Sequence, residues 1–229
     1  METPRRLIVK KISLFLLILI FIPVVGFCMT TRTLEADTDL RPQGWTSGAL
    51  RFKHGSTVEL NERGDVISGV LARYENLLPT GSAFSENWVP YYGVILSECL
   101  QFNMGDRITF DENGHVISGV LDVPARIHLI PKIEPLVLFK KAILFDKRGN
   151  LIKGTLANDT FLQPTGGNLF LQTGALLKFK AKTEVIFGPN AQVIQGTIAN
   201  DLSINKKIFP AGTTLQFKES DYPKIVSNT

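Results

Sequence analysis

Cysteine is nearly absent from this chain, and so are the residue patterns by which metal proteins are recognised. The sequence contains two cysteines, Cys28 and Cys99, and three histidines. If the apolar segment that holds Cys28 is removed, Cys99 is left alone, so the core must be stabilised by packing rather than by disulfides. None of His54, His115 and His128 stands at metal-ligand spacing from a cysteine, another histidine or a pair of acids. The sequence therefore predicts no metal site.

Catalytic and nucleic-acid-binding patterns are lacking as well. There is no glycine-rich phosphate loop and no G-x-S-x-G motif. The net charge is +4, but residues 1–28 contribute +3 of it, so the remainder carries about +1 and has no basic excess for nucleic acid. We expect no enzymatic activity, no cofactor and no nucleic-acid partner.

One long apolar run is present, near the N-terminus. "ISLFLLILIFIPVVGFCM" (Ile12–Met29) has no charge and follows a basic stretch over residues 5–11. This layout is typical of an export signal, and the run is close to the ~18–20 residues that span a bilayer as a helix. A cleaved signal peptide, an uncleaved anchor and a lipid on Cys28 all remain open. Each places the rest of the chain outside the cytoplasm, in the periplasm or beyond the cell, and the uncleaved form anchors it in the inner membrane through residues 12–29.

The rest of the sequence is internally repetitive. Four segments align around one glycine, and a second phrase, Leu-x-Pro-x-Gly, recurs at residues 40–44, 77–81 and 162–166. Each unit predicts a strand, a tight turn, a second strand and a looser connection. The four aligned segments are "GDVISGVLA" from Gly64, "GHVISGVLD" from Gly114, "GNLIKGTLA" from Gly149 and "AQVIQGTIA" from Ala191.

The turns and second strands have a clear local interpretation. "NERG", "DENG", "DKRG" and "GPNA" fit a type I turn that ends in a left-handed residue. In the strand that follows, alternation predicts Ile67, Gly69 and Leu71 on the inner face, with the corresponding residues of the other units, and polar residues on the outer face. The outer-face positions are Ser68, Ser118, Lys153 and Gln195. A glycine inside a strand needs a reason, and we expect a phenylalanine ring, such as Phe110, Phe145 or Phe187, to lie across it.

These patterns predict an all-β fold: an array of repeated β-hairpins that forms an elongated antiparallel sheet or a β-solenoid-like roll, preceded by an N-terminal apolar helix. The expected divisions are a signal peptide or anchor over 1–30, the hairpin repeat domain over 31–219 and a C-terminal tail over 220–229. Insertions fall at "SAFSENWVPYYG" after Gly81 and "DVPARIHLIPKIEP" after Leu121. Open sheet edges at the ends of such an array allow self-association.

The units "FDENGHVISGVL", "FDKRGNLIKGTLANDT" and "FGPNAQVIQGTIAND" resemble the repeats of bacterial exported proteins with MORN-like β-hairpins. The resemblance covers about residues 33–219. It implies a β-hairpin architecture and no shared catalytic residues, and it assigns no activity.

Candidate functional residues are few. An aspartate recurs in the repeats at Asp37, Asp159 and Asp201, which favours a structural role such as an Asx turn onto the local backbone. The insertion after Gly81 carries the aromatic residues of a candidate binding surface, to which Lys153 on the outer strand face is added. The alternative is that these aromatics only cap the end of the hairpin stack. The four aromatic residues are Phe84, Trp88, Tyr91 and Tyr92.

The function most consistent with this sequence is a non-catalytic exported envelope protein that serves as a binding or structural scaffold. Its partner would be a protein or glycan of the cell envelope, and it would meet the membrane only through the N-terminal segment. Two alternatives remain: an enzyme acting on cell-wall glycan through Glu86, Glu98 or Glu134 in the insertions, and a membrane-tethered spacer in which the hairpins only set a distance.

Overall fold

The computed structural model describes residues 29–81, 99–130, 133–171 and 176–228, and within them the chain is all-β. A single 3-10 turn, η1 (Gly167–Leu169), interrupts the strands of this part of the chain. The predicted apolar N-terminal helix falls on residues outside the described ranges. Nowhere in those ranges does a helix have the length and apolarity needed to cross a membrane.

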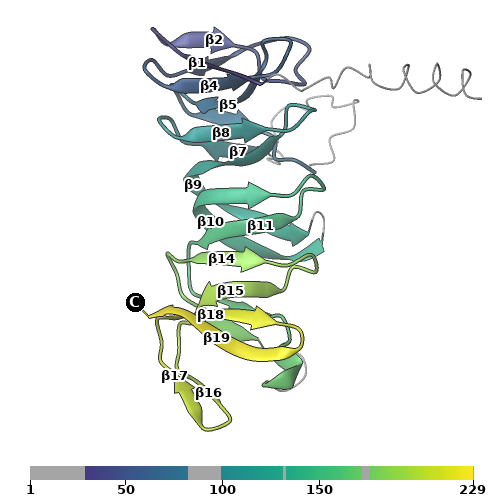
Figure 1. Cartoon of the computed structure of the whole chain (residues 1–229), viewed down its shortest axis with the longest axis vertical. Helices are drawn as coiled ribbons and strands as arrows, with labels where there is room; N and C mark the ends of the chain where they lie inside the picture. The colour runs from purple at the N-terminus through teal and green to yellow at the C-terminus, as the bar shows by residue number, and fades with distance from the viewer. Residues whose placement is uncertain (1–28, 82–98, 131–132, 172–175, 229) are drawn as a thin grey trace, which may run out of the picture.

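Thirteen strands form one antiparallel sheet, and the eleven on its main path make up the larger of two layers, which runs along the long axis of the molecule (Figure 1). The strand order is β1-β4-β5-β8-β9-β10-β11-β14-β15-β18-β19, with β7 beside β9 and β6 beside β7. The elongated antiparallel sheet predicted from the sequence is therefore confirmed. Its strands are β1 (Thr30–Thr33), β4 (Thr57–Leu60), β5 (Val66–Val70), β6 (Glu75–Leu77), β7 (Leu100–Phe102), β8 (Arg107–Phe110), β9 (Val116–Ile130), β10 (Ile133–Phe145), β11 (Leu151–Leu156), β14 (Glu184–Phe187), β15 (Val193–Thr197), β18 (Thr213–Lys218) and β19 (Asp221–Asn228).

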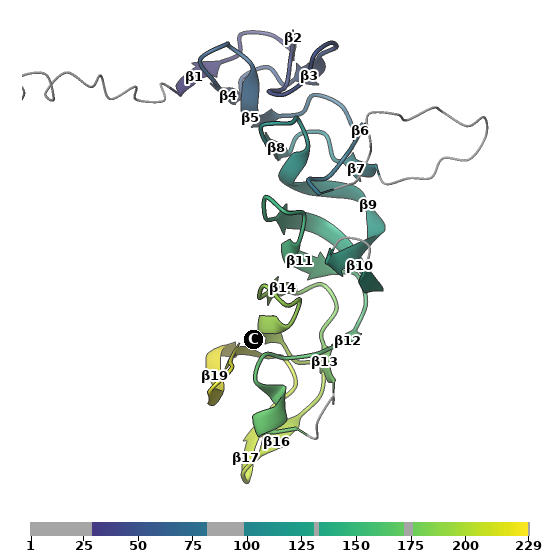
Figure 2. The ribbon, with the colours of Figure 1, turned by 90° about the vertical axis from the view of Figure 1, so that its right-hand side faces the viewer.

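Short strand pairs form the second layer, on the opposite side from the long sheet in the side view (Figure 2). Strands β9 and β10 are long enough to belong to both layers, and β6 and β7 lie with the short pairs. The remaining pairs are β2 (Thr38–Leu40) with β3 (Leu50–Phe52), β12 (Thr160–Leu162) with β13 (Leu177–Phe179), and β16 (Leu202–Ile204) with β17 (Lys207–Phe209).

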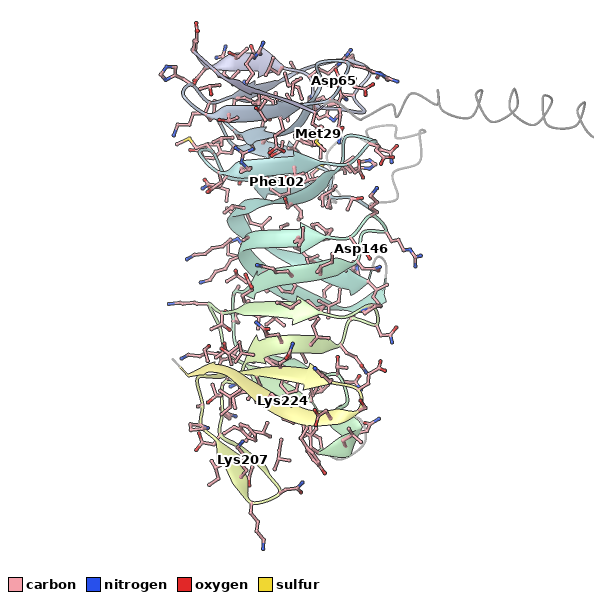
Figure 3. All side chains as sticks on the ribbon, in the orientation of Figure 1. Met29, Asp65, Phe102, Asp146, Lys207 and Lys224 are labelled. Atoms are coloured by element: carbon pink, nitrogen blue, oxygen red, sulfur yellow. The ribbon has the colours of Figure 1, made fainter. Side chains whose placement is uncertain are left out.

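A column of phenylalanine rings fills the space between the layers and explains the strand glycines. A Cβ added to Gly154 would lie 2.7 Å from Cδ1 of Phe139, and Gly69, Gly119 and Gly196 meet a ring in the same way. The expectation that a ring crosses each bare glycine is correct, but the rings differ from those named above. They are the earlier aromatic of each unit, Phe52, Phe102, Phe139 and Phe179, each at most 1 % exposed, rather than Phe110, Phe145 and Phe187. Figure 3 labels Phe102 within the body of the molecule.

The predicted inward isoleucine of each second strand is wrong, because the strands carry a β-bulge there. Glu59 pairs with Ser68 but Leu60 pairs with Val66, which leaves Ile67 as the extra residue. A bulge reverses the alternation, so Val66 is buried and Ile67 is half-exposed. The same shift occurs at the corresponding positions of three later hairpins, where the extra residues are Ile117, Ile152 and Ile194.

The tight turns have the predicted conformation and lie along one edge of the long sheet, here called the turn edge (residues 61–65, 111–115, 146–150 and 188–192). Gly64 has φ 78°, and Gly114, Gly149 and Ala191 are left-handed as well. In the third turn, Oδ1 of Asp146 accepts hydrogen bonds from the amides of Arg148 and Asn150, both at 2.8 Å. Figure 3 shows Asp146 at this edge.

The recurring Leu-x-Pro-x-Gly phrase joins each unit to two later ones. Pro42 forms a parallel bridge with Val66, and the phrases around Pro79 and Pro164 repeat it with Val116 and Val193. A Cβ on Gly44 would overlap the backbone of the turn at residues 112–114. Gly81 and Gly166 pack in the same way against backbone at residues 148–149 and 218–219. The phrase therefore recurs because each copy packs against the turns of neighbouring units along the turn edge.

The opposite edge, here called the corner edge, is where the chain passes from the second layer into the long sheet, at residues 53–56, 103–106, 140–142, 180–183 and 210–213. The amides of Gly55, Gly105, Lys182 and Gly212 donate to the carbonyls of Leu34, Leu71, Leu156 and Ile198 at 2.8–2.9 Å. The recurring aspartates serve this edge: Asp37, Asp159 and Asp201 accept from the amides of His54, Ala181 and Ala211, each at 2.8 Å. Their role is structural as expected, but the bond reaches the next corner instead of closing a local Asx turn.

Two further segments differ from the sequence expectations. Residues 221–228, expected within a C-terminal tail, form β19 and cover the edge of β18. The segment after Leu121, expected as an inserted connection, continues β9 and pairs with β10. Alternating apolar residues at Ile127, Leu129 and Val137 are buried, which explains why this segment joins the sheet.

Candidate interaction surface

The outward face of the long sheet presents one continuous cross-strand row, here called the outer row. One residue from each of the eleven strands on the sheet path stands directly opposite the next. With strands about 4.8 Å apart, the row extends over roughly 48 Å. Its members are Thr31, Glu59, Ser68, Thr109, Ser118, Leu144, Lys153, Ile186, Gln195, Gln216 and Lys224.

Most of the outer row is polar but uncharged, and its charges are largely paired. Lys153 contacts Glu184 on the adjacent strand at 2.8 Å. At the far end, Lys224 contacts Asp221 at 2.7 Å, and the hydrogen bond from this lysine is the main reason that the pKa of Asp221 lies below its ordinary value. Hydroxyl and amide groups on a sheet face can donate and accept hydrogen bonds with a sugar or a peptide. The row is therefore suited to contact rather than to proton transfer.

Arginine and aliphatic side chains complete this face. Arg107 reaches back across β5 and donates to Oγ of Ser68 at 2.9 Å and to the Thr57 carbonyl at 3.0 Å. This explains why Ser68, which lies on the outer row, is only 3 % exposed. Leu144 and Ile186, on either side of Lys153, are half-exposed. The centre of the row thus combines one cation with two aliphatic side chains.

Hydrogen bonds hold the turn edge together, and those to Asp146 also lower the pKa of that residue. Burial works against the charged form of Asp146, but the hydrogen bonds from the Asn150 side chain and from the amides of Asn150 and Arg148 outweigh it and lower the pKa of Asp146. Trp45 Nε1 donates to the Gly114 carbonyl at 3.1 Å. The Asp146 contacts hold its own turn, and the Trp45 contact joins the second turn to the segment that contains Pro42 and Gly44.

The corner edge carries lysines that sequence reasoning missed. The left-handed residue of the corner is Gly55, Gly105 and Gly212 in three units, but Lys141 (φ 59°) and Lys182 (φ 64°) in two adjacent ones. A left-handed conformation costs a non-glycine residue about 1–2 kcal/mol. The signal was available in the sequence, because Lys182 follows its phenylalanine by the same three positions as the corner glycines follow theirs.

The predicted binding residues are only partly placed by the structure. Lys153 lies in the middle of the outer row. Phe84, Trp88, Tyr91 and Tyr92 lie outside the described residues, as do Glu86 and Glu98 of the enzyme hypothesis, and the side chain of Glu134 is likewise not described. The grouping of Lys153 with the aromatic insertion therefore stays a prediction.

The histidines have ordinary neighbours where their contacts are defined. His115 Nδ1 lies 3.6 Å from Oδ2 of Asp111 within the same turn, and the amide of His54 is bonded to Asp37. Over the described ranges, no three His, Cys, Asp or Glu side chains are grouped so that they could hold a metal ion.

Comparison with known proteins identifies no relative: no family model, no curated protein and no solved structure matches the chain.

Proposed function

We propose that the chain is a non-catalytic exported protein of the cell envelope, in which an array of repeated hairpins forms a β-roll that holds a protein or glycan partner. The observation that carries this proposal is the outer row, a mostly polar row roughly 48 Å long with one residue from each of eleven strands. Such a face can align an extended partner along many small contacts without a pocket.

Recurring contacts support the repeat array. The left-handed turn residue, the bulge and the strand glycine with a ring across it follow one another in the same order in successive hairpins. One hairpin alone is marginal in water, whereas hairpins placed edge to edge bury a continuous apolar face. Export is supported by the basic and apolar N-terminal sequence and by the similarity to exported proteins with MORN-like hairpins.

Site-specific photocrosslinking in the native host tests the outer row. The photoreactive residue is placed at Lys153 and at Gln195, two members of the row on different strands. Glu62, an exposed residue of the first turn, is the matched control because it lies at the edge of the same sheet. A separate probe at Tyr92 tests the aromatic insertion.

A discrete adduct with one protein or glycan at Lys153 and Gln195, and none at Glu62, is the expected result. Equal labelling at all positions would mean that the row has no preferred partner, and the spacer hypothesis would then be the better explanation. An adduct only at Tyr92 would move the binding site to the aromatic insertion and refute the assignment to the outer row.

A further inference from the structure

The corner edge contains two adjacent lysines in a backbone conformation that favours glycine. Lys141 and Lys182 occupy the left-handed position of their corners, where Gly55, Gly105 and Gly212 stand in the other units. The fold does not require a side chain at this position, since three corners form without one. A lysine there is therefore disfavoured by the backbone and needs a reason outside the fold.

The surroundings of these lysines are strongly basic. Lys140 and Lys180 are their near neighbours in sequence, and Lys141, Lys180 and Lys182 are exposed. The nearby carboxylate of Asp159 is already engaged, because Oδ1 accepts from the Ala181 amide at 2.8 Å and Oδ2 lies 3.5 Å from Nζ of Lys178. Asp122 and Glu184 are the other acids near these corners, and Glu184 already contacts Lys153 at 2.8 Å. Counting Lys153 and Lys178, six lysines thus stand near three carboxylates.

The electrostatic environment of Asp159 agrees with this excess of positive charge. The Ala181 amide is the main cause that lowers the pKa of Asp159, and the charges of Lys178 and Lys180 lower it further against the opposing effect of burial. Asp159 therefore remains ionised, and the positive charge of the lysines still exceeds that of the acids.

The geometry of the edge selects a linear partner. Consecutive corners are two strands apart in the sheet, which places the lysine groups of neighbouring units about 10 Å apart along the long axis. This spacing is comparable with the length of a disaccharide. A polymer with regularly spaced anionic groups can therefore meet the charges of both units.

The position of the N-terminus disfavours a membrane as the partner. Thr30 pairs with Leu60 and so lies at the turn edge, whereas Thr33 pairs with Thr57 near the corner edge. An anchor over residues 12–29 would therefore join the sheet at the turn edge, on the side opposite the lysines.

We propose that Lys140, Lys141, Lys180 and Lys182 form a cationic ridge that binds a linear polyanion of the cell envelope, with carboxylates or phosphodiesters along its chain. This site is distinct from the outer row and does not depend on a partner being bound there. It relies on the proposed export only for access to the polymer, so a binding assay with purified components tests it separately.

The experiment measures binding of the full chain, in nonionic detergent, to polygalacturonate and to poly(glycerol phosphate), with dextran as the neutral control. The test variant is Lys141→Gly with Lys182→Gly, which removes two charges and restores the residue that the other corners use. The matched control is Lys147→Gln with Arg148→Gln, which removes two charges from the turn edge. Thermal unfolding of each variant is measured in parallel.

The expected result is binding to one or both polyanions that weakens with salt, and none to dextran. The double glycine variant should bind about five- to tenfold more weakly, as two exposed charge contacts imply, with an unchanged or higher unfolding temperature. The turn-edge control should change binding less than about twofold.

Three results would overturn the proposal. Equal weakening in both double variants would indicate a general effect of net charge. Absence of binding to either polyanion would exclude the ligand class. If the double glycine variant kept the wild-type affinity for both polymers, the ridge lysines would not form their binding site.

Discussion

Adding one methyl group to a strand glycine should destabilise the protein, although glycine is normally a poor residue in a strand. Gly154 is the clearest position, because all three of its nearest neighbours are atoms of Phe139. The Cβ of Gly154→Ala would lie 2.7 Å from Cδ1 and 2.9 Å from Cε1 of that ring. Carbon atoms prefer separations of about 3.5–4.0 Å, so the ring must move by nearly 1 Å.

The ring has little room to move. Phe139 is fully buried and makes an edge-to-face contact with Phe187, with ring centroids 6.1 Å apart. Overpacking of a dense core costs roughly 1–3 kcal/mol. Replacing a strand glycine with alanine returns about 0.5–1 kcal/mol through the unfolded state and strand propensity. The balance of these two effects runs from about 0 to 2.5 kcal/mol, and we expect Gly154→Ala to lower the free energy of unfolding by about 1 kcal/mol.

A double-mutant cycle in urea, followed by tryptophan fluorescence, measures this coupling. Phe139→Leu removes the ring atoms that the new Cβ would meet, so it should be less harmful in the Gly154→Ala background than in the wild type. A coupling free energy of about 1 kcal/mol or more is expected for two residues in such close contact. If Gly154→Ala were stabilising, or if the two substitutions were additive, the account of why glycine recurs in these strands would be wrong.

Three more predictions concern the turn edge. Gly44→Ala should lower the unfolding free energy by more than about 2 kcal/mol in urea, because its φ is 80° and the added Cβ overlaps the backbone of the 111–114 turn. Trp45→Phe removes the indole donor to that turn and should cost about 0.5–1.5 kcal/mol in the same assay. Asp146→Asn tests the lowered pKa of Asp146 by urea unfolding across pH: an aspartate whose folded pKa is depressed stabilises above its unfolded pKa of about 3.9 and loses this effect as pH falls through the folded value. The asparagine variant should therefore lose less stability than the wild type below pH ~4, and Asn61 shows that asparagine fits this turn position.

The turns of this fold could be predicted from the sequence because their chemistry is local. Asp146 and Gly149, like their counterparts in other units, have side chains and backbone freedom that suit one turn type regardless of distant contacts. The partner of each strand glycine could not be predicted in the same way. Choosing between Phe139 and Phe145 requires the direction of each side chain, which depends on pairing across the sheet.

The β-bulge is the physical reason for the largest error in the sequence interpretation. Val66 and Gly69 are three residues apart, so strict alternation would place them on opposite faces, yet both are buried. An extra residue at Ile67 is the solution that the structure adopts. Strict alternation assigned Ile67 to the core because it lies two residues before Gly69 and would therefore share its face. Only the register with the preceding strand reveals that the valine is the inward residue.

Of the two candidate sites, the sequence predicted a residue of the outer row but not the lysines of the ridge. Lys153 was correctly assigned to the outward face. The extra residue of the bulge is Ile152, so the alternation of faces from Lys153 to Gly154 is undisturbed. The ridge lysines were missed because their significance is comparative: Lys182 stands out only when its corner is aligned with those of Gly55 and Gly105. In a repetitive fold, each position that departs from the structural consensus at a cost to the backbone is a candidate for function. By this argument the lysine corners, rather than the recurring contacts of the core, are the positions at which we propose to look for function.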